Sequence, residues 1–323
     1  MSISQGMYEL SPLFARQLTN SDDDEGNSLQ LIHVFISFHL FGFFGTIIML
    51  LTACFSRTTP RHPTWISFAI SWIISTFSYS LLFLGGHLTG SEPGYPLCLV
   101  QGVMIYSAPP LTAATTCALV IQIWFLVRSV ATSTSSGKGH ILSSMWSASL
   151  LIIPYLLYVT IVVAMLVVGI QTPSTVQRVS SGMYCNFANR IPGRISTFLV
   201  ASIMIPTVFL EIQVCMALRR NWNLFKSQKG SLSMILRVVI FTLFGFFAIA
   251  ASILFFFTVH HGPQLNVVIS LIPIAAVLVF ATQGDLIRVW MFWRKRPDDA
   301  NTEDVVRPPS PDPRKSESIL VIG

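Results

Sequence analysis

Charged side chains are scarce in this sequence. Of its 323 residues only 11% are Asp, Glu, Lys or Arg, whereas 52% are hydrophobic. A typical soluble domain is about one quarter charged, so most of this chain is expected to lie inside a lipid bilayer. The net charge of +6 does not indicate nucleic-acid binding, because the basic residues lie at the ends of apolar runs and form no contiguous basic face.

Motifs for catalysis and for cofactors are missing as well. The sequence has no nucleophile elbow, zinc motif, phosphate-binding loop or dinucleotide fingerprint, so we expect neither an enzyme nor a metal or cofactor. The seventh apolar run lacks the lysine that a retinal Schiff base needs. No internal repeat of the kind found in many transporters is visible. Residues 1–30 do not resemble a secretory signal peptide, so the first apolar run is expected to direct insertion.

What the sequence does contain is a series of long apolar runs. A helix needs about 20 apolar residues to cross a bilayer. Seven runs reach this length: 31–55, 64–88, 97–127, 144–170, 195–218, 234–259 and 266–287. We therefore predict an all-α fold, a seven-transmembrane helix bundle over residues 31–287. An N-terminal tail (1–30) precedes it, and a juxtamembrane segment with a disordered tail (288–323) follows it.

The basic residues predict the orientation of the bundle. Sixteen of the twenty Lys and Arg residues fall in the segments on one side of the seven spans, and loops rich in Lys and Arg face the cytoplasm. Six of the seven tryptophans lie near the same side, where the indole ring is favoured at the membrane surface. The N-terminus is therefore expected outside and the C-terminus inside, as in a multi-pass protein of the plasma membrane.

The run 97–127 is expected to lie at the centre of the bundle. Small and polar side chains recur along it at steps of three and four: Gln101, Ile105, Ala108, Thr112, Thr115, Leu119 and Gln122. Such a stripe is typical of a helix that faces other helices rather than lipid. Pro109 and Pro110, near the middle of the run, are expected to break the helix and to form the floor of a cavity.

Two of the five cysteines are expected to form a disulfide. Cys98 and Cys185 fall on the outer side, whereas the other three lie inside apolar runs. A bridge between them would hold the loop 171–194 as a lid over the mouth of the bundle. The alternative is two unpaired cysteines.

Two acidic residues lie toward the inner ends of the spans. Glu211 is in the fifth apolar run and Asp285 in the seventh, and a charge inside a membrane normally has a partner. Arg128 and Arg237 are the candidate partners, and a Glu211–Arg237 pair would form an ionic latch that a conformational change could open. The alternative is that these charged groups reach the membrane surface, above all Asp285.

Histidines gather toward the outer half of the predicted bundle. They are His33, His39, His87, His260 and His261, and they have no spacing typical of metal or haem ligands. We expect them to line an outer pocket.

The arrangement of spans and cysteines resembles that of G-protein-coupled receptors. Cys98 at the head of the third span and Cys185 in the second outer loop match the receptor disulfide. Arg128 stands in the place of the arginine of the Asp-Arg-Tyr motif, without the acid and the tyrosine, and Pro206 resembles the proline of span five. The segments 62–67 and 106–112 are similar to uncharacterised seven-helix proteins of mushroom-forming fungi.

The resemblance implies a receptor that senses an extracellular peptide, lipid or small molecule and signals through a heterotrimeric G protein. The residues expected to contact this ligand are Gln101, Tyr106, Thr112, His87 and Tyr184. Two other interpretations stay open. One is a transporter or channel for an unknown solute, and the other is a membrane enzyme that acts on lipid with the outer histidines as bases.

Overall fold

Helices make up most of the structure. The computed structural model describes residues 6–55, 61–88, 92–132, 139–179, 181–220, 237, 239–240, 242–246, 250 and 263–282. The helices are α1 (Gly6–Phe55), α2 (Pro63–Leu84), α3 (Tyr95–Thr132), α4 (Gly139–Gln171), α5 (Arg190–Arg220) and α8 (Pro263–Ala281). Between α4 and α5 lie the short 3-10 helix η1 (Pro173–Thr175) and the strands β1 (Val176–Arg178) and β2 (Cys185–Phe187).

Five helices are long and apolar enough to cross a membrane. The apolar stretches are Leu29–Phe55, Pro63–Leu84, Tyr95–Ser129, Trp146–Gln171 and Arg190–Arg220. They match the first five apolar runs of the sequence and indicate a multi-pass membrane protein. The apolar part of α8, Asn266–Ala281, is shorter and coincides with the start of the seventh run. Most of the sixth run lies outside the described residues.

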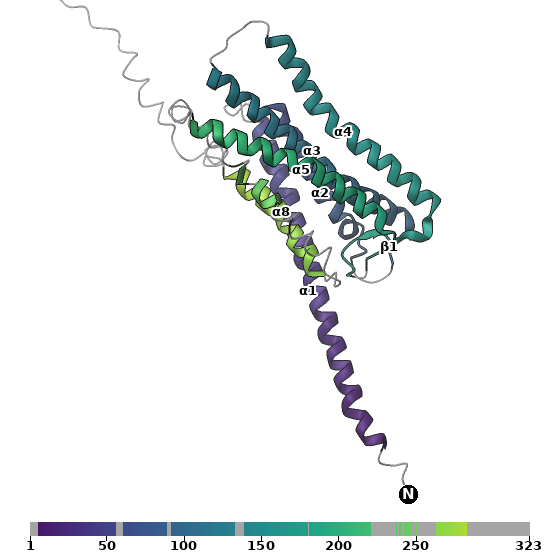
Figure 1. Cartoon of the computed structure of the whole chain (residues 1–323). Coiled ribbons are helices and arrows are strands. Elements are labelled where there is room, and N and C mark those ends of the chain that lie inside the picture. Colours follow the sequence, from purple (N-terminus) through teal and green to yellow (C-terminus); the bar gives the residue numbers. More distant parts are fainter. Residues whose placement is uncertain are drawn as a thin grey trace, which may run out of the picture.

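Helix α1 is much longer than the first apolar run. Residues 6–28, which the sequence assigns to an N-terminal tail, continue the same helix. Figure 1 shows this part of α1 extending well beyond the other described helices, which lie side by side.

Helix α3 lies at the centre of the described bundle. It packs against α2, α4 and α5. Within its apolar stretch 61% of the residues are buried, against 11% in α4, so α4 is the helix with most surface available to lipid. The polar stripe of α3 is buried except for the half-buried Gln122, and its Thr115 hydroxyl lies 2.8 Å from the Ser71 hydroxyl of α2. The central position predicted from this stripe is therefore confirmed.

The expected break at the two prolines of α3 is wrong, because the helix continues through both residues. Pro110 has no N–H, so the carbonyl of Tyr106, one turn earlier, loses its donor within the helix. The Ser196 hydroxyl of α5 donates to this carbonyl at 2.8 Å. Neighbouring helices often supply such donors in a bilayer, where water cannot. The double proline thus creates a bond between α3 and α5.

The loop between α4 and α5 forms a β-hairpin, which the all-α prediction missed. Strands β1 and β2 pair antiparallel, with Val176 opposite Phe187 and Arg178 opposite Cys185. The turn includes Gly182, whose φ of 71° is a conformation that favours glycine. Cys98 at the start of α3 forms a disulfide with Cys185, as the sequence predicts.

Helices α1 and α8 approach closely at two glycines of α1. A Cβ atom built on Gly42 would lie 2.5 Å from the Cβ of Pro273. One built on Gly45 would lie 2.7 Å from Cγ1 of Val277. Small residues allow the backbones of membrane helices to come together in this way.

We predict that Gly45→Ala lowers the free energy of unfolding in lipid nanodiscs by about 1–3 kcal/mol, because the new methyl group overpacks the contact with Val277. The double variant Gly45→Ala/Val277→Ala should recover part of this loss. Gly193→Ala in α5 is the control, since its Cβ would meet its nearest neighbour at 3.5 Å. A single variant as stable as the wild type, or a double variant no better than the single one, would contradict the close packing.

Candidate functional site

The β-hairpin is held against the helices by hydrogen bonds as well as by the disulfide. The Gln101 side chain of α3 donates from Nε2 to the Ser78 carbonyl of α2 at 3.1 Å. Its Oε1 accepts from the backbone N–H of Cys185 at 2.9 Å. Gln101 is fully buried, so one amide group joins two helices and the hairpin in a site without water.

An aromatic cluster lies beneath the hairpin. The Tyr184 ring is 5.8 Å from Tyr79 of α2 and 6.1 Å from Phe35 of α1. Its hydroxyl donates to Oδ1 of Asn266 in α8 at 3.2 Å. Burial raises the pKa of Tyr184 to about 12, so this hydroxyl stays protonated at physiological pH. Behind Tyr79, the buried His39 ring stacks on it at 4.6 Å.

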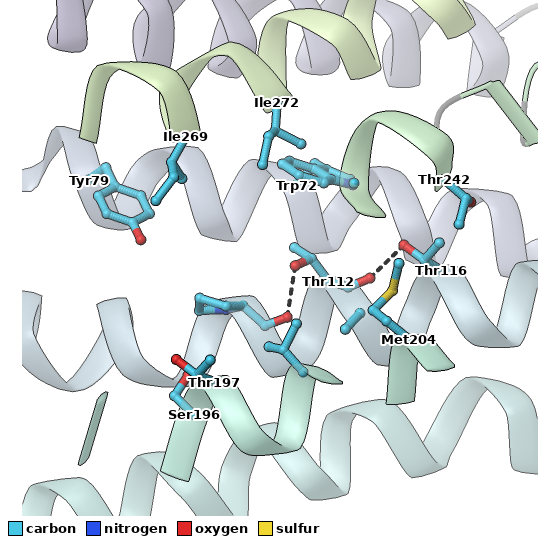
Figure 2. A pocket seen from close by; sticks show the side chains of 14 residues that line it. Trp72, Tyr79, Thr112, Thr116, Ser196, Thr197, Met204, Thr242, Ile269 and Ile272 are labelled. Carbon is cyan, nitrogen blue, oxygen red and sulfur yellow. Dashed lines mark hydrogen bonds between the residues drawn. The ribbon is translucent and has the colours of Figure 1, made fainter. Parts of the chain in front are cut away.

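A cavity of about 250 Å³ lies between α2, α3, α5, α8 and the helical residues 242–245. Figure 2 shows Trp72 and Ile272 on one side and Met204 on the other, with Tyr79 and Thr242 at opposite ends. Among the described residues that line it, no side chain carries a charge. The cavity is therefore mostly apolar, and the polar groups of its described lining side chains are hydroxyls and the indole N–H of Trp72.

Most of these hydroxyls already donate to a backbone carbonyl. Thr112 donates to Pro109 at 2.9 Å, Thr116 to Thr112 at 2.6 Å and Thr197 to Gly193 at 2.9 Å. A hydroxyl bonded in this way can still accept a hydrogen bond but has no further proton to donate.

The hydroxyls of Tyr79 and Thr242, which also line the cavity, make no such bond to a backbone carbonyl. In the part of the chain that the structure describes, neither the Tyr79 hydroxyl nor the Thr242 hydroxyl has a hydrogen-bond partner. The cavity therefore has one unused donor near each end.

The five residues predicted to contact a ligand do not lie together at one site in the structure. Of the five, Thr112 lines the cavity. Gln101 fastens the hairpin, and Tyr184 belongs to the aromatic cluster beneath it. The Tyr106 ring packs against Phe187 at 5.7 Å, and His87 is half-buried just beyond the end of α2.

Sequence reasoning missed most of the residues that line the cavity. Trp72 and Tyr79 are seven residues apart in α2 and so lie on one helix face, which is the signal that could have found them. Met204 and Thr242 carry no such local signal, because only the packing of distant segments brings them to the same space.

Glu211, one of the predicted latch residues, is buried in α5 with 5% of its surface exposed. Its carboxyl group faces the Thr242 hydroxyl, although Oε1 of Glu211 and Oγ1 of Thr242 make no hydrogen bond of standard geometry in the described chain. Thr242 thus touches the cavity on one side and Glu211 on the other.

The predicted partners of Glu211 lie elsewhere. The Arg237 guanidinium donates to the Val279 carbonyl at 2.5 Å and to the Thr282 carbonyl at 2.8 Å, at the C-terminal end of α8. The carbonyl groups at the C-terminal end of a helix carry a partial negative charge, so a cation is favoured there. The exposed Arg128 side chain stacks over the Trp124 ring at 5.0 Å. Asp285 lies outside the described residues.

A comparison with known protein families finds none that matches the chain, and no curated protein matches its sequence.

We predict that Gln101→Leu lowers the free energy of unfolding by about 1–3 kcal/mol, because it leaves the buried N–H of Cys185 without a partner. Thermal unfolding in nanodiscs measures the effect, and gel mobility with and without reductant shows whether the disulfide still forms. Gln122→Leu on the same helix is the control and should change stability by less than about 0.5 kcal/mol. Equal effects of the two substitutions would rule out the special role of Gln101.

Proposed function

We propose that this chain is a seven-helix receptor of the plasma membrane, with its N-terminus outside and its C-terminus in the cytoplasm. It senses a molecule that binds in the cavity and signals to a cytoplasmic partner, a heterotrimeric G protein. The contact that supports this proposal most strongly is the one between Thr242 and Glu211. A ligand that moves Thr242 changes the surroundings of a buried ionisable group on a different helix.

Such a group is well suited to a switch. An isolated charge at the centre of a membrane span costs at least about 2.5–3.5 kcal/mol, so the Glu211 carboxyl favours whichever arrangement of α5 and residues 242–246 gives it a partner. Ligand binding can then shift the balance between two arrangements, provided that the ligand binds one of them more tightly.

The inner end of α5 is the proposed output of this switch. Its last turn carries Arg219 and Arg220, both of them exposed. Arg237 is bonded to the end of α8, so Arg237 and α8 are expected to move together relative to α5. A basic surface at a cytoplasmic helix end suits an acidic surface of a protein partner.

The experiment measures the distance between the inner ends of α5 and α8 in nanodiscs. Fluorescent amino acids at the exposed Met216 and at the exposed Leu278 report this distance and leave the proposed partner surface intact, while a library of apolar small molecules is added. We expect binding compounds to change it and to increase co-purification with G-protein α subunits. Glu211→Gln, which has the same shape but cannot ionise, should keep binding and lose most of the distance change.

Several results would contradict the proposal. One is a distance that no compound alters, and another is a Glu211→Gln variant that responds like the wild type. Passage of a solute through liposomes that contain the purified protein would support the transporter or channel instead.

A further inference from the structure

The space in the cavity limits the size of its ligand. Pockets for drug-sized molecules usually span about 300–1,000 Å³, and this cavity has about 250 Å³. On the outer side, the hairpin residues Met183 and Cys185 are fully buried, and Tyr184 packs between α1 and α2. A folded peptide or a large lipid therefore does not fit beneath the hairpin.

The walls of the cavity limit the charge of the ligand. Trp72, Met204 and Ile269 contribute apolar surface, and no described lining residue is charged. A charged molecule would lose its hydration in such a site without gaining a counter-charge, which is strongly unfavourable. The Glu211 carboxyl lies behind Thr242 and is not part of the lining.

The two unused hydroxyls limit the polar groups of the ligand. Tyr79 and Thr242 lie at opposite ends of the cavity (Figure 2), and each has a proton to donate. The other hydroxyls of the lining are already bonded to backbone carbonyls. A ligand oxygen placed at either end would therefore accept a hydrogen bond that the protein itself leaves unmade.

From these three observations we propose that the cavity binds a small, uncharged, mostly apolar molecule with a hydroxyl or carbonyl oxygen. The oxygen accepts a hydrogen bond from Tyr79 or Thr242, and the apolar body lies along Trp72, Met204 and Ile269. Medium-chain alcohols and ketones have this chemistry. The inference names the ligand class of the site in the proposed function, but binding can be tested without any signalling.

The test compares five compounds with the same carbon chain: octanol, octanone, octane, octanoate and octylammonium. Binding to the full chain in nanodiscs is measured with radiolabelled compounds and by thermal shift. Ala113→Leu places a larger side chain into the cavity from its wall. The signal that remains with this variant measures partition into lipid and is subtracted. We expect octanol and octanone to bind, octane to bind more weakly, and the two charged compounds not to bind above the Ala113→Leu background.

Conservative substitutions test the two hydroxyls. A hydrogen bond contributes about 0.5–1.5 kcal/mol, so we expect Tyr79→Phe or Thr242→Val to weaken octanol binding by roughly 3- to 10-fold and to leave octane unchanged. Thr160→Val is the matched control, because its exposed hydroxyl lies on α4 and bonds to its own helix.

Several outcomes would contradict the proposed class of ligand. Octane that binds as well as octanol would show that no polar group is recognised, and so would unchanged octanol binding by both hydroxyl variants. Tighter binding of octylammonium, lost in Glu211→Gln, would show a site for cations. If the neutral compounds bind as expected but leave the distance between α5 and α8 unchanged, the ligand class stands and the receptor proposal fails.

Discussion

Inside a bilayer every backbone polar group needs a partner from the protein itself, and this constraint accounts for most of the contacts between the helices described here. Pro110 removes a donor from α3, and α5 supplies the missing one through Ser196. Gln101 satisfies the N–H of Cys185 in the same way, from a side chain that water does not reach. Polar residues thus decide which helices become neighbours, because apolar contact alone does not distinguish a neighbouring helix from lipid.

The cavity follows from the same constraint. Its hydroxyls bind backbone carbonyls of their own or neighbouring helices, so they line an apolar space without a need for water. The exceptions are the hydroxyls of Tyr79 and Thr242 and, behind Thr242, Oε1 of Glu211, which make no hydrogen bond of standard geometry in the described chain. Unsatisfied buried groups are unusual in folded proteins, and they concentrate where ligands bind or conformations change.

The sequence predicts much of this fold, because hydrophobic length is a local property. Five apolar runs form helices of membrane-spanning length, and the polar stripe correctly predicts α3 at the centre.

Where the prediction from sequence failed, a residue distant in the chain determines the local structure. Ser196 lies about 90 positions from the carbonyl that it satisfies, so the continuity of α3 could not be read from its prolines. Arg237 likewise bonds to the end of α8, which the spacing of charges does not reveal. The cavity depends on five separate segments, and of its lining residues the sequence pointed only to Thr112 and Pro109.

The disulfide has a consequence for α4 rather than for the hairpin that it holds. Cys98 and Cys185 are 87 residues apart, and the whole of α4 lies in the chain between them. The covalent ring therefore encloses the helix that has the least buried surface of the five spans. Lipid can compete for the weak contacts of α4 with its neighbours, but the ring limits how far the helix can diffuse away. The local concentration of α4 beside α3 therefore stays high. Lipids can exchange along this face, and α4 can then pack against its neighbours again.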